Sequence, residues 1–277
     1  MQSKNGTIQG SNNHLAGAMN VLLDKMDSYT LDRGNEPTSA YAPLTVYRFE
    51  SPTEQTSYIQ EPAVCLIAQG YKRVLLGEEE FFYNKDSFLI TSIDLPIIAQ
   101  ILEASKEKPY LGLTLKLDKK QIARMMLEDH ISPPRSRAAE RGLAVSRLEQ
   151  PLAQAFLRLM DLLNHPEDIP VLAPLIQQEI VYRLLTGEQG KRLQQISMVG
   201  SHGNQIARAI DWLKENYNKS FKVDELAALS GMSASSLHHH FRAVTAMSPL
   251  QYQKRLRLNE ARQIMLMEHK DATTTAF

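Results

Sequence analysis

Residues 224–267 read DELAALSGMSASSLHHHFRAVTAMSPLQYQKRLRLNEARQIMLM, and their apolar side chains recur at helical spacing. Leu226, Ala227 and Leu229 supply the apolar stripe of a first short helix. Gly231 follows, where a chain that leaves a helix often needs a positive φ, which glycine adopts without a Cβ clash. Two short helices across such a turn form a helix-turn-helix, whose second helix usually lies in the DNA major groove.

The second and third helices follow from the same spacing. Leu237, Phe241 and Val244 recur at i, i+4 and i+7, which defines one face of an amphipathic helix. Ser248 and Pro249 offer a polar N-cap and a proline at the first position of the next helix. We predict that this third helix, residues 250–268, buries five side chains: Leu256, Leu258, Ala261, Ile264 and Met265.

The same stretch is locally basic. Between Met232 and Met267 there are five basic residues against one acidic residue, in a chain whose formal net charge is zero. A solvated helix face with a chance surplus of cations would explain this. Attraction to phosphate groups explains it better, because the surplus is confined to one part of a balanced chain.

Successive helical residues are rotated by about 100°, which separates the outer face of the second helix from its core face. Ser235, His239 and Arg242 point away from the apolar stripe, and His238 flanks them. His240 lies nearer the core, so we expect it to pack against other side chains. Hydroxyls and imidazoles can hydrogen-bond to base edges, and arginine can pair with guanine or phosphate. Three consecutive histidines diverge too widely to close easily on one metal ion.

The run from Leu226 to Arg262, with LAALSGMS, LHHHF and MSPLQYQKRLRLNEAR, resembles the first DNA-binding subdomain of the AraC/XylS family of transcription regulators. That family joins two helix-turn-helix units by a long linker helix, which here would be residues 250–268. The resemblance implies four base-reading positions: Ser235, His238, His239 and Arg242. Three cations of the linker helix are expected to contact DNA phosphates: Lys254, Arg255 and Arg257.

The last seven residues, DATTTAF, look like the opening of a second helix-turn-helix, whose recognition helix is absent from this sequence. A longer natural chain would restore that second unit. The alternative is a protein-interaction or ligand-binding module that keeps the fold but has lost DNA binding. The residues leave both open.

Length and composition bound the remaining possibilities. A chain of 277 residues normally holds two domains, and 43% hydrophobic with 22% charged residues is ordinary for a soluble globular protein. The polar first twenty residues lack the apolar core of a signal peptide, and no apolar run reaches the roughly 18 residues of a membrane helix. Cys65 is the single cysteine, which excludes an internal disulfide. We expect a cytoplasmic protein with no membrane partner.

The N-terminal half changes from helical periodicity to a period of two. We expect disorder over residues 1–13, a helix over 14–29 and a turn-rich connection over 34–43. Short strands are then predicted over 44–49, 63–69, 72–76, 79–83, 87–91, 97–102 and 111–117. Such strands with hairpin-like turns indicate an antiparallel barrel or sandwich. AVCLIAQG (63–70) and TSIDLP (91–96) resemble the N-terminal domain of one AraC-type subfamily, which implies a cupin-like barrel that senses an effector or helps dimerisation.

The cupin likeness raises a metal-dependent enzyme as the main rival. Cupin enzymes generally bind metal through histidines and a carboxylate, but residues 44–117 contain no histidine. The sequence also lacks a G-x-S-x-G run and a phosphate-binding glycine loop. We therefore predict no enzymatic activity, no cofactor and no metal site.

Three residues are candidates for an effector pocket: Cys65, Phe81 and Tyr83. Cys65 lies among Val64, Leu66 and Ile67, so a small buried hydrophobe is its simplest role. The sharper hypothesis is that a reactive effector, such as an aldehyde or an oxidant, modifies this thiol. Phe81 and Tyr83 share one strand face, which could line a pocket or pack as aromatic core.

The second half of the chain is predicted to be helical. We expect helices over 119–130, 148–164, 172–186 and 204–217, the last capped by Asn204, with a polar connection over 131–142. Leu175, Ile176, Ile180 and Leu184 are expected to face inward. The helical hairpin of residues 148–186 can pack on its own barrel or on a second subunit, and the family resemblance favours a homodimer.

The sequence therefore predicts an α+β protein: an N-terminal antiparallel cupin-like barrel, a helical connector and an all-α helix-turn-helix domain. The expected units are an N-terminal tail and helix (1–36), a sensor barrel (37–118), a connector (119–195) and a DNA-binding domain (204–277). We interpret the chain as a one-component transcription regulator. Its expected partners are double-stranded DNA, a small-molecule effector, RNA polymerase and a second copy of the chain.

Overall fold

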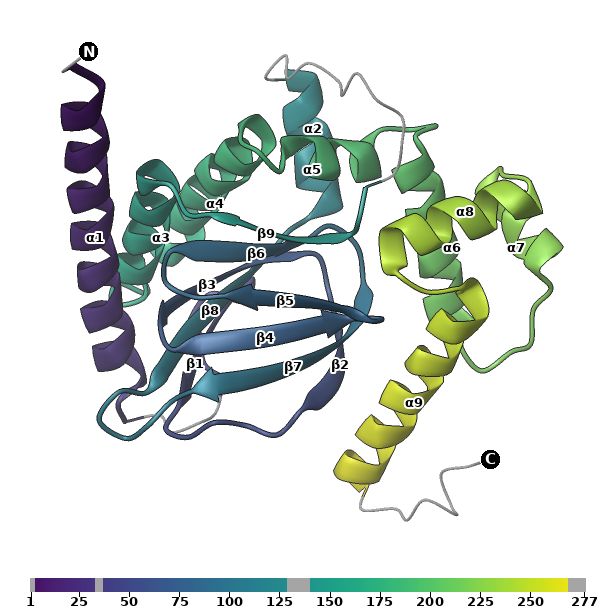
Figure 1. Ribbon diagram of the computed structural model, residues 1–277, viewed down its shortest axis with the longest axis horizontal. Coiled ribbons are helices and arrows are strands. Elements are labelled where there is room, and N and C mark those ends of the chain that lie inside the picture. The colour runs from purple at the N-terminus through teal and green to yellow at the C-terminus, as the bar shows by residue number, and fades with distance from the viewer. Residues whose placement is uncertain (1–2, 33–36, 129–139, 269–277) are drawn as a thin grey trace.

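The computed structural model describes residues 3–32, 37–128 and 140–268, with the backbone alone over 3–13 and 266–268. Most of the connection expected over 131–142, and the whole DATTTAF segment, lie outside these residues. Figure 1 shows the strands as a central body, with the N-terminal helix along one side and the last four helices on the other. Among the described helices, none is long and apolar enough to cross a membrane.

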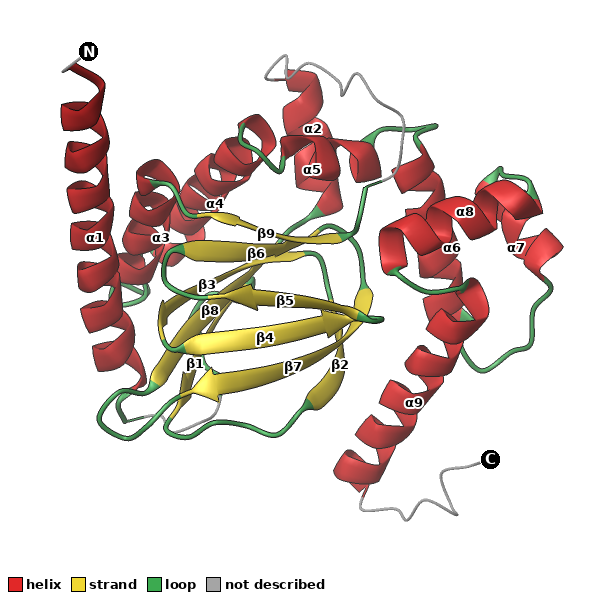
Figure 2. Ribbon diagram, viewed as in Figure 1, coloured by secondary structure: helices red, strands yellow, loops and turns green. Residues whose placement is uncertain are grey.

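The strands form two antiparallel sheets (Figure 2). The five-stranded sheet consists of β1 (Leu44–Phe49), β3 (Ala63–Gln69), β6 (Ser87–Thr91), β8 (Tyr110–Lys116) and β9 (Leu143–Arg147). Its order is β1-β8-β3-β6-β9. The four-stranded sheet consists of β2 (Thr56–Gln60), β4 (Tyr71–Leu76), β5 (Glu79–Tyr83) and β7 (Leu95–Glu103), in the order β2-β7-β4-β5.

The predicted α+β class and the antiparallel N-terminal domain are confirmed. The described strands do not close into one barrel, however, but remain two sheets packed face to face. Strand periodicity explains the layers, since successive side chains point to opposite faces. Leu111, Leu113 and Leu115 of β8 join the apolar cluster under the helices, whereas Tyr110 joins the cluster between the sheets.

Five helices follow or cover the sheets: α1 (Ser3–Thr30), α2 (Lys119–Glu128), α3 (Gln150–Leu162), α4 (Ile169–Thr186) and α5 (Gly190–Ser197). The first helix lies across β1, β3 and β8 and packs on α3. Met19, Leu22 and Met26 of α1 are buried there. Each such side chain contributes about 1.5–3 kcal/mol of transfer free energy, before the cost of ordering it.

The expectation of disorder over residues 1–13 is wrong for the described part, because α1 begins at Ser3. Helix propagation adds one hydrogen bond for each residue ordered, once a nucleus exists. The packed half of α1 provides that nucleus, which composition alone does not reveal.

The predicted elements do not include β2, β9 and α5. All five residues of β2 are only half-buried, so the strand lacks the apolar alternation that marked its neighbours. The predicted helix over 172–186 agrees with the end of α4, but no further helix was expected where α5 starts at Gly190. A Cβ at Gly190 would meet the Leu185 carbonyl oxygen at 1.9 Å, so glycine serves a close backbone approach there.

The last four helices form the predicted helix-turn-helix region: α6 (His202–Glu215), α7 (Val223–Ser230), α8 (Ala234–Thr245) and α9 (Pro249–Glu268). Gly231 is left-handed, with φ of 73°, as predicted for the turn. The N-cap of α6 is Ser201 rather than Asn204, since the Ser201 side chain accepts a hydrogen bond from the Asn204 backbone N–H.

Three side chains that were expected to be buried are exposed: Leu258, Met265 and Leu175. In α9, Leu258 and Met265 are exposed, because the helix buries Tyr252, Leu256 and Asn259 at i, i+4 and i+7. In α4, Leu175 is 58% exposed, while Ile180 and Leu184 are buried as expected.

Candidate DNA interface and sensor cavity

The orientation of α8 is determined by its apolar stripe. Leu237 and Phe241 are fully buried and Val244 nearly so, as predicted. The ring of Phe241 meets that of Tyr252 on α9 edge-on, with 5.5 Å between centroids. Ser233 caps the helix, since its hydroxyl accepts a hydrogen bond from the Ser236 backbone N–H at 3.2 Å. These contacts leave only the opposite face of α8 free for a partner.

The four predicted base-reading residues are all exposed: Ser235, His238, His239 and Arg242. His240 instead stacks on the His202 ring of α6, with 3.8 Å between centroids. Burial lowers the pKa of His240, and the neighbouring His202 and His239 lower it further, so this imidazole stays neutral at neutral pH. Within the part of the chain that the structure describes, no three histidine, cysteine or acidic residues are grouped as metal ligands.

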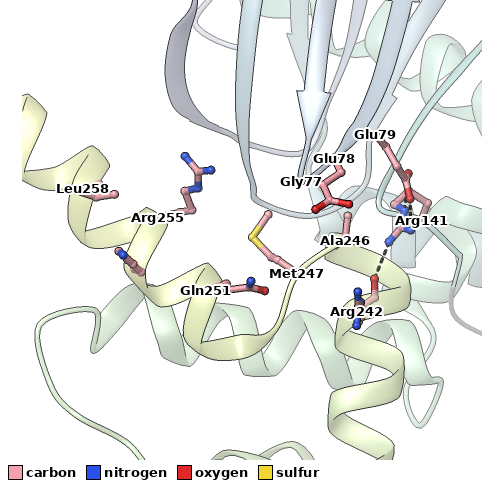
Figure 3. A pocket seen from close by; sticks show the side chains of 11 residues that line it. Gly77, Glu78, Glu79, Arg141, Arg242, Ala246, Met247, Gln251, Arg255 and Leu258 are labelled. Carbon is pink, nitrogen blue, oxygen red and sulfur yellow. Dashed lines mark hydrogen bonds and ion pairs between the residues drawn. The ribbon is translucent and has the colours of Figure 1, made fainter.

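Two of the three predicted phosphate contacts lie beside Arg242. Lys254 and Arg255 line, with Arg242, a groove of about 860 Å³ between α8, α9 and the turn that joins β4 to β5 (Figure 3). Arg257 is placed elsewhere, since its guanidinium donates to the carbonyl oxygens of Tyr217 at 2.6 Å and Lys219 at 3.1 Å. We call the groove that Arg242, Lys254 and Arg255 line the basic groove.

The N-terminal half forms the opposite wall of the basic groove. The Arg141 guanidinium pairs with the Glu79 carboxylate and donates to the backbone carbonyl oxygens of Arg242 at 2.6 Å and Ala243 at 2.5 Å. The Gly142 N–H donates to the Val244 carbonyl oxygen at 2.8 Å. Arg141 and Gly142 thus donate hydrogen bonds to carbonyl groups at the C-terminal end of α8, and the Arg242 carbonyl oxygen also accepts one from the Ala246 backbone N–H. The sequence pattern around Arg141 indicates only a polar connection and not this contact.

A second junction forms at Asp94 of the TSIDLP motif. The Tyr252 hydroxyl donates to the Asp94 backbone carbonyl oxygen at 2.7 Å. The Asp94 carboxylate, only 6% exposed, pairs with the Lys214 ammonium of α6 at 2.7 Å. This motif therefore connects the sheets to the DNA-binding helices, which its strand-and-turn pattern did not indicate.

A cavity of about 320 Å³ lies between the two sheets. We call it the inter-sheet cavity. Its walls are mostly aromatic and neutral polar side chains, with one cation: Tyr47, Phe49, Thr53, Thr56, Tyr58, Gln60, Lys72, Ala99, Gln100, Ile101, Tyr110 and Thr114. The three residues predicted to form an effector pocket do not line it directly.

Those three residues lie in the packing around the inter-sheet cavity. Tyr83 and Cys65 are buried, and Phe81 packs half-buried against the same apolar cluster. The Cys65 Sγ is 3.4 Å from the Thr114 hydroxyl, which does line the cavity. Burial raises the pKa of the Cys65 thiol, although the nearby Lys72 ammonium acts to lower it. The thiol is therefore protonated at neutral pH and is a poor nucleophile.

We predict that native Cys65 reacts with the disulfide reagent DTNB at pH 8 on the order of tenfold or more slowly than in the urea-unfolded chain, because the buried thiol must first be exposed. The absorbance of released thiolate measures the rate, and Cys65 is the single cysteine of the sequence. Cys65→Ser is the blank. Rapid stoichiometric labelling of the native protein would contradict this and revive the reactive-effector hypothesis.

Comparison with known proteins agrees with this architecture. The family model for the AraC-type transcriptional regulator N-terminus matches residues 40–192, and that for bacterial regulatory helix-turn-helix proteins of the AraC family matches residues 213–254. The putative HTH-type transcriptional regulator YneL of Escherichia coli (strain K12) is 68% identical over 31 residues, 11% of this chain and 52% of YneL. The chain thus spans about half the length of that relative.

Solved structures with some similarity include ToxT from Vibrio cholerae, at 15% identity and a TM-score of 0.31, over 76% of this chain and 97% of ToxT. The AraC-like transcriptional activator CuxR is similar at 13% identity and a TM-score of 0.35, over 82% of this chain and 80% of CuxR. The N-terminal family model alone covers more than half of the sequence. The chain therefore belongs to the AraC family of transcriptional regulators.

Proposed function

We propose that the protein regulates transcription by binding double-stranded DNA in a sequence-specific manner, with α8 in the major groove. The observation that carries this proposal is the asymmetry of α8, whose apolar face is buried while Ser235, His239 and Arg242 are exposed together. A helix seated in this way presents hydrogen-bonding side chains to base edges. Because chromosomal DNA is the proposed partner, we propose that the protein acts in the cytoplasm, by binding and not by catalysis.

Individual residues receive different roles in this proposal. Arg242 can pair with a guanine, and Ser235, His238 and His239 can hydrogen-bond to neighbouring bases. Lys254 and Arg255 are suited to phosphates, because both are exposed in the basic groove. Arg257 was expected to share that role. Its guanidinium already donates to two backbone carbonyl oxygens, so we assign it to holding α9 against the chain after α6.

The N-terminal half is proposed to control DNA binding through the basic groove and to respond to a small-molecule effector. Glu78 and Glu79 lie in the same groove as Arg242 and Arg255 (Figure 3). Their carboxylates oppose the approach of DNA phosphates to these cations. The sheets can be packed against α8 and α9 in two arrangements that differ in DNA affinity. An effector that binds one arrangement more tightly than the other would shift the DNA affinity of the protein.

A second copy of the chain is the proposed protein partner, with RNA polymerase as a further one at target promoters. Support for the dimer comes from α4, where Val171, Leu175 and Tyr182 are exposed by 66%, 58% and 46%. Their spacing of four and seven residues places them on one side of the helix. An apolar stripe of this kind on a surface helix fits a symmetric helix-to-helix contact.

We predict that Arg242→Ala weakens binding to the preferred DNA site by about 1–3 kcal/mol and relaxes the preference at one base pair. The preferred site is first selected from a random-sequence DNA library by the purified protein, and affinities then follow from fluorescence anisotropy at fixed salt. Lys85→Ala, which removes an exposed cation from the β5–β6 turn, is the matched control. Unchanged affinity and preference in Arg242→Ala would show that α8 does not dock as proposed.

We also predict that Glu78→Gln raises DNA affinity about twofold at low salt, because one carboxylate at about 8–10 Å from a phosphate costs roughly 0.4–0.5 kcal/mol in water. The gain should fade at high salt, where such charges are screened. Glu167→Gln, in the turn between α3 and α4, controls for the change in net charge. Equal gains in both variants would mean that the basic groove does not face DNA.

Leu175→Arg should shift the protein from dimer to monomer in sedimentation velocity at micromolar concentration. The substitution places a charge in the centre of the exposed α4 stripe, where like charges from two copies would meet. Leu127→Arg, on the exposed side of α2, is the control for a new surface arginine. A wild-type protein that is already monomeric would remove the basis of the dimer proposal.

A further inference from the structure

Lys72 occupies a position where the fold calls for an apolar side chain. In the β4 register it pairs with Tyr83 on β5 and Ile101 on β7, both buried in the cluster between the sheets. Val74 and Leu76, two and four residues later on the same face of β4, are buried in that cluster. Lys72 therefore points between the sheets, where it lines the inter-sheet cavity.

Among the residues that the structure describes, the Lys72 ammonium has no acidic partner. No acidic side chain lines the inter-sheet cavity, and in the described residues no carboxylate forms an ion pair with Lys72. A desolvated cation of this kind is costly unless a partner of opposite charge compensates it. The inter-sheet cavity thus presents a half-buried cation to which an anion from outside the chain can bind.

Lys72 is nevertheless protonated. Burial acts to lower the pKa of its ammonium, but the phenol groups of Tyr58 and Tyr110 beside it raise the pKa above its ordinary value. Burial also raises the pKa of Tyr110 to about 12, so this phenol is neutral and can donate a hydrogen bond. A protonated amine does not add to a carbonyl group, which argues against a Schiff base with an aldehyde.

The shape and lining of the inter-sheet cavity restrict the ligand. Its volume of about 320 Å³ lies at the small end of the range for small-molecule pockets, about 300–1,000 Å³. Phe49, Ile101 and Tyr110 offer apolar surface, and the Thr114 hydroxyl lines the same cavity. One cation without a second basic group matches a single negative charge. A dianionic phosphate would instead favour several donors or an arginine fork.

We propose that the inter-sheet cavity binds a small carboxylic acid as its anion, with the carboxylate on the Lys72 ammonium and an aliphatic or aromatic body against Phe49, Ile101 and Tyr110. This inference rests on the proposed effector role of the N-terminal half and names the chemical class and the anchoring residue. The ion pair supplies the missing counter-charge, and the apolar body replaces water along the cavity wall.

The position of β2 gives such a ligand a direct route to the DNA-binding helices. Tyr58 and Gln60 of β2 line the inter-sheet cavity and also a second groove, whose far wall includes Leu256 and Asn259 of α9. The Arg262 guanidinium of α9 donates to the Ser57 carbonyl oxygen at 3.3 Å. A ligand that moves β2 therefore acts on the helix that carries Lys254 and Arg255.

The test is isothermal titration calorimetry of the purified full chain at neutral pH with hexanoate, octanoate and 3-phenylpropanoate, each compared with its neutral primary amide. At least one acid should bind, and its amide should bind at least about tenfold more weakly, because the charge-assisted contact is lost. Lys72→Met keeps the length of the side chain but removes its charge. This variant should lower the affinity for that acid by a similar factor. Lys85→Met, an exposed lysine of the β5–β6 turn, should bind like wild type.

A second variant keeps Lys72 and fills the cavity instead. Ala99 lies in the cavity wall and is 5% exposed, so Ala99→Leu adds side-chain volume inside the cavity. This variant should no longer bind the acid, and circular dichroism should show that its fold is intact. The proposal is overturned if none of the three acids binds, if amides bind as well as acids, or if Lys72→Met retains full affinity. The calorimetric assay contains no DNA, so these results would not contradict the DNA-binding proposal. Unchanged DNA recognition in Arg242→Ala would likewise not contradict acid binding at Lys72.

Discussion

The structure depends on the burial of β3 on both of its faces. Alternate residues of this strand belong to two apolar clusters, one under α1, α3 and α4 and the other between the sheets. The second cluster does not end at the sheets, since it continues into the inward faces of α6, α7, α8 and α9. Apolar burial stabilises in proportion to the area removed from water, without preferred direction. The two sheets and the helix-turn-helix region are therefore held together by one continuous core, and the polar contacts between them supply the orientation.

Those polar contacts lie at the rim of the shared core. Asp94 receives the Tyr252 hydroxyl and the Lys214 ammonium on one side, and Arg141 reaches the end of α8 on the other. Hydrogen bonds at buried or half-buried sites are directional and costly to leave unmade, so each favours one seating of the helices on the sheets. Between the two junctions, β2 separates the inter-sheet cavity from α9. These few contacts thus determine how the helix-turn-helix region is oriented on the sheets.

The features that sequence analysis predicted correctly are those decided by neighbours along the chain. Leu237, Phe241 and Gly231 belong to short periodic or turn patterns, so the helix-turn-helix and the outer face of α8 could be placed before the structure. The start of α1, the strand β2 and the exposure of Leu258 depend on partners distant in sequence, which no local pattern encodes. The inter-sheet cavity likewise depends partly on local pattern and partly on partners distant in sequence. The period of Lys72, Val74 and Leu76 could have placed the lysine inside, but only the sheet pairing shows what surrounds it.

Arg141 and Gly142 hold α8 by its backbone and not by its side chains. Every residue type carries the carbonyl oxygens that these groups contact. The outer side chains of α8 can therefore change during evolution without loss of the link to the N-terminal half. Duplicated copies of such a gene could diverge in the DNA sequence they recognise while inheriting the same control by the sensor. The separation of the two properties in the chemistry of one helix makes a regulator of this kind easy to redirect to new genes.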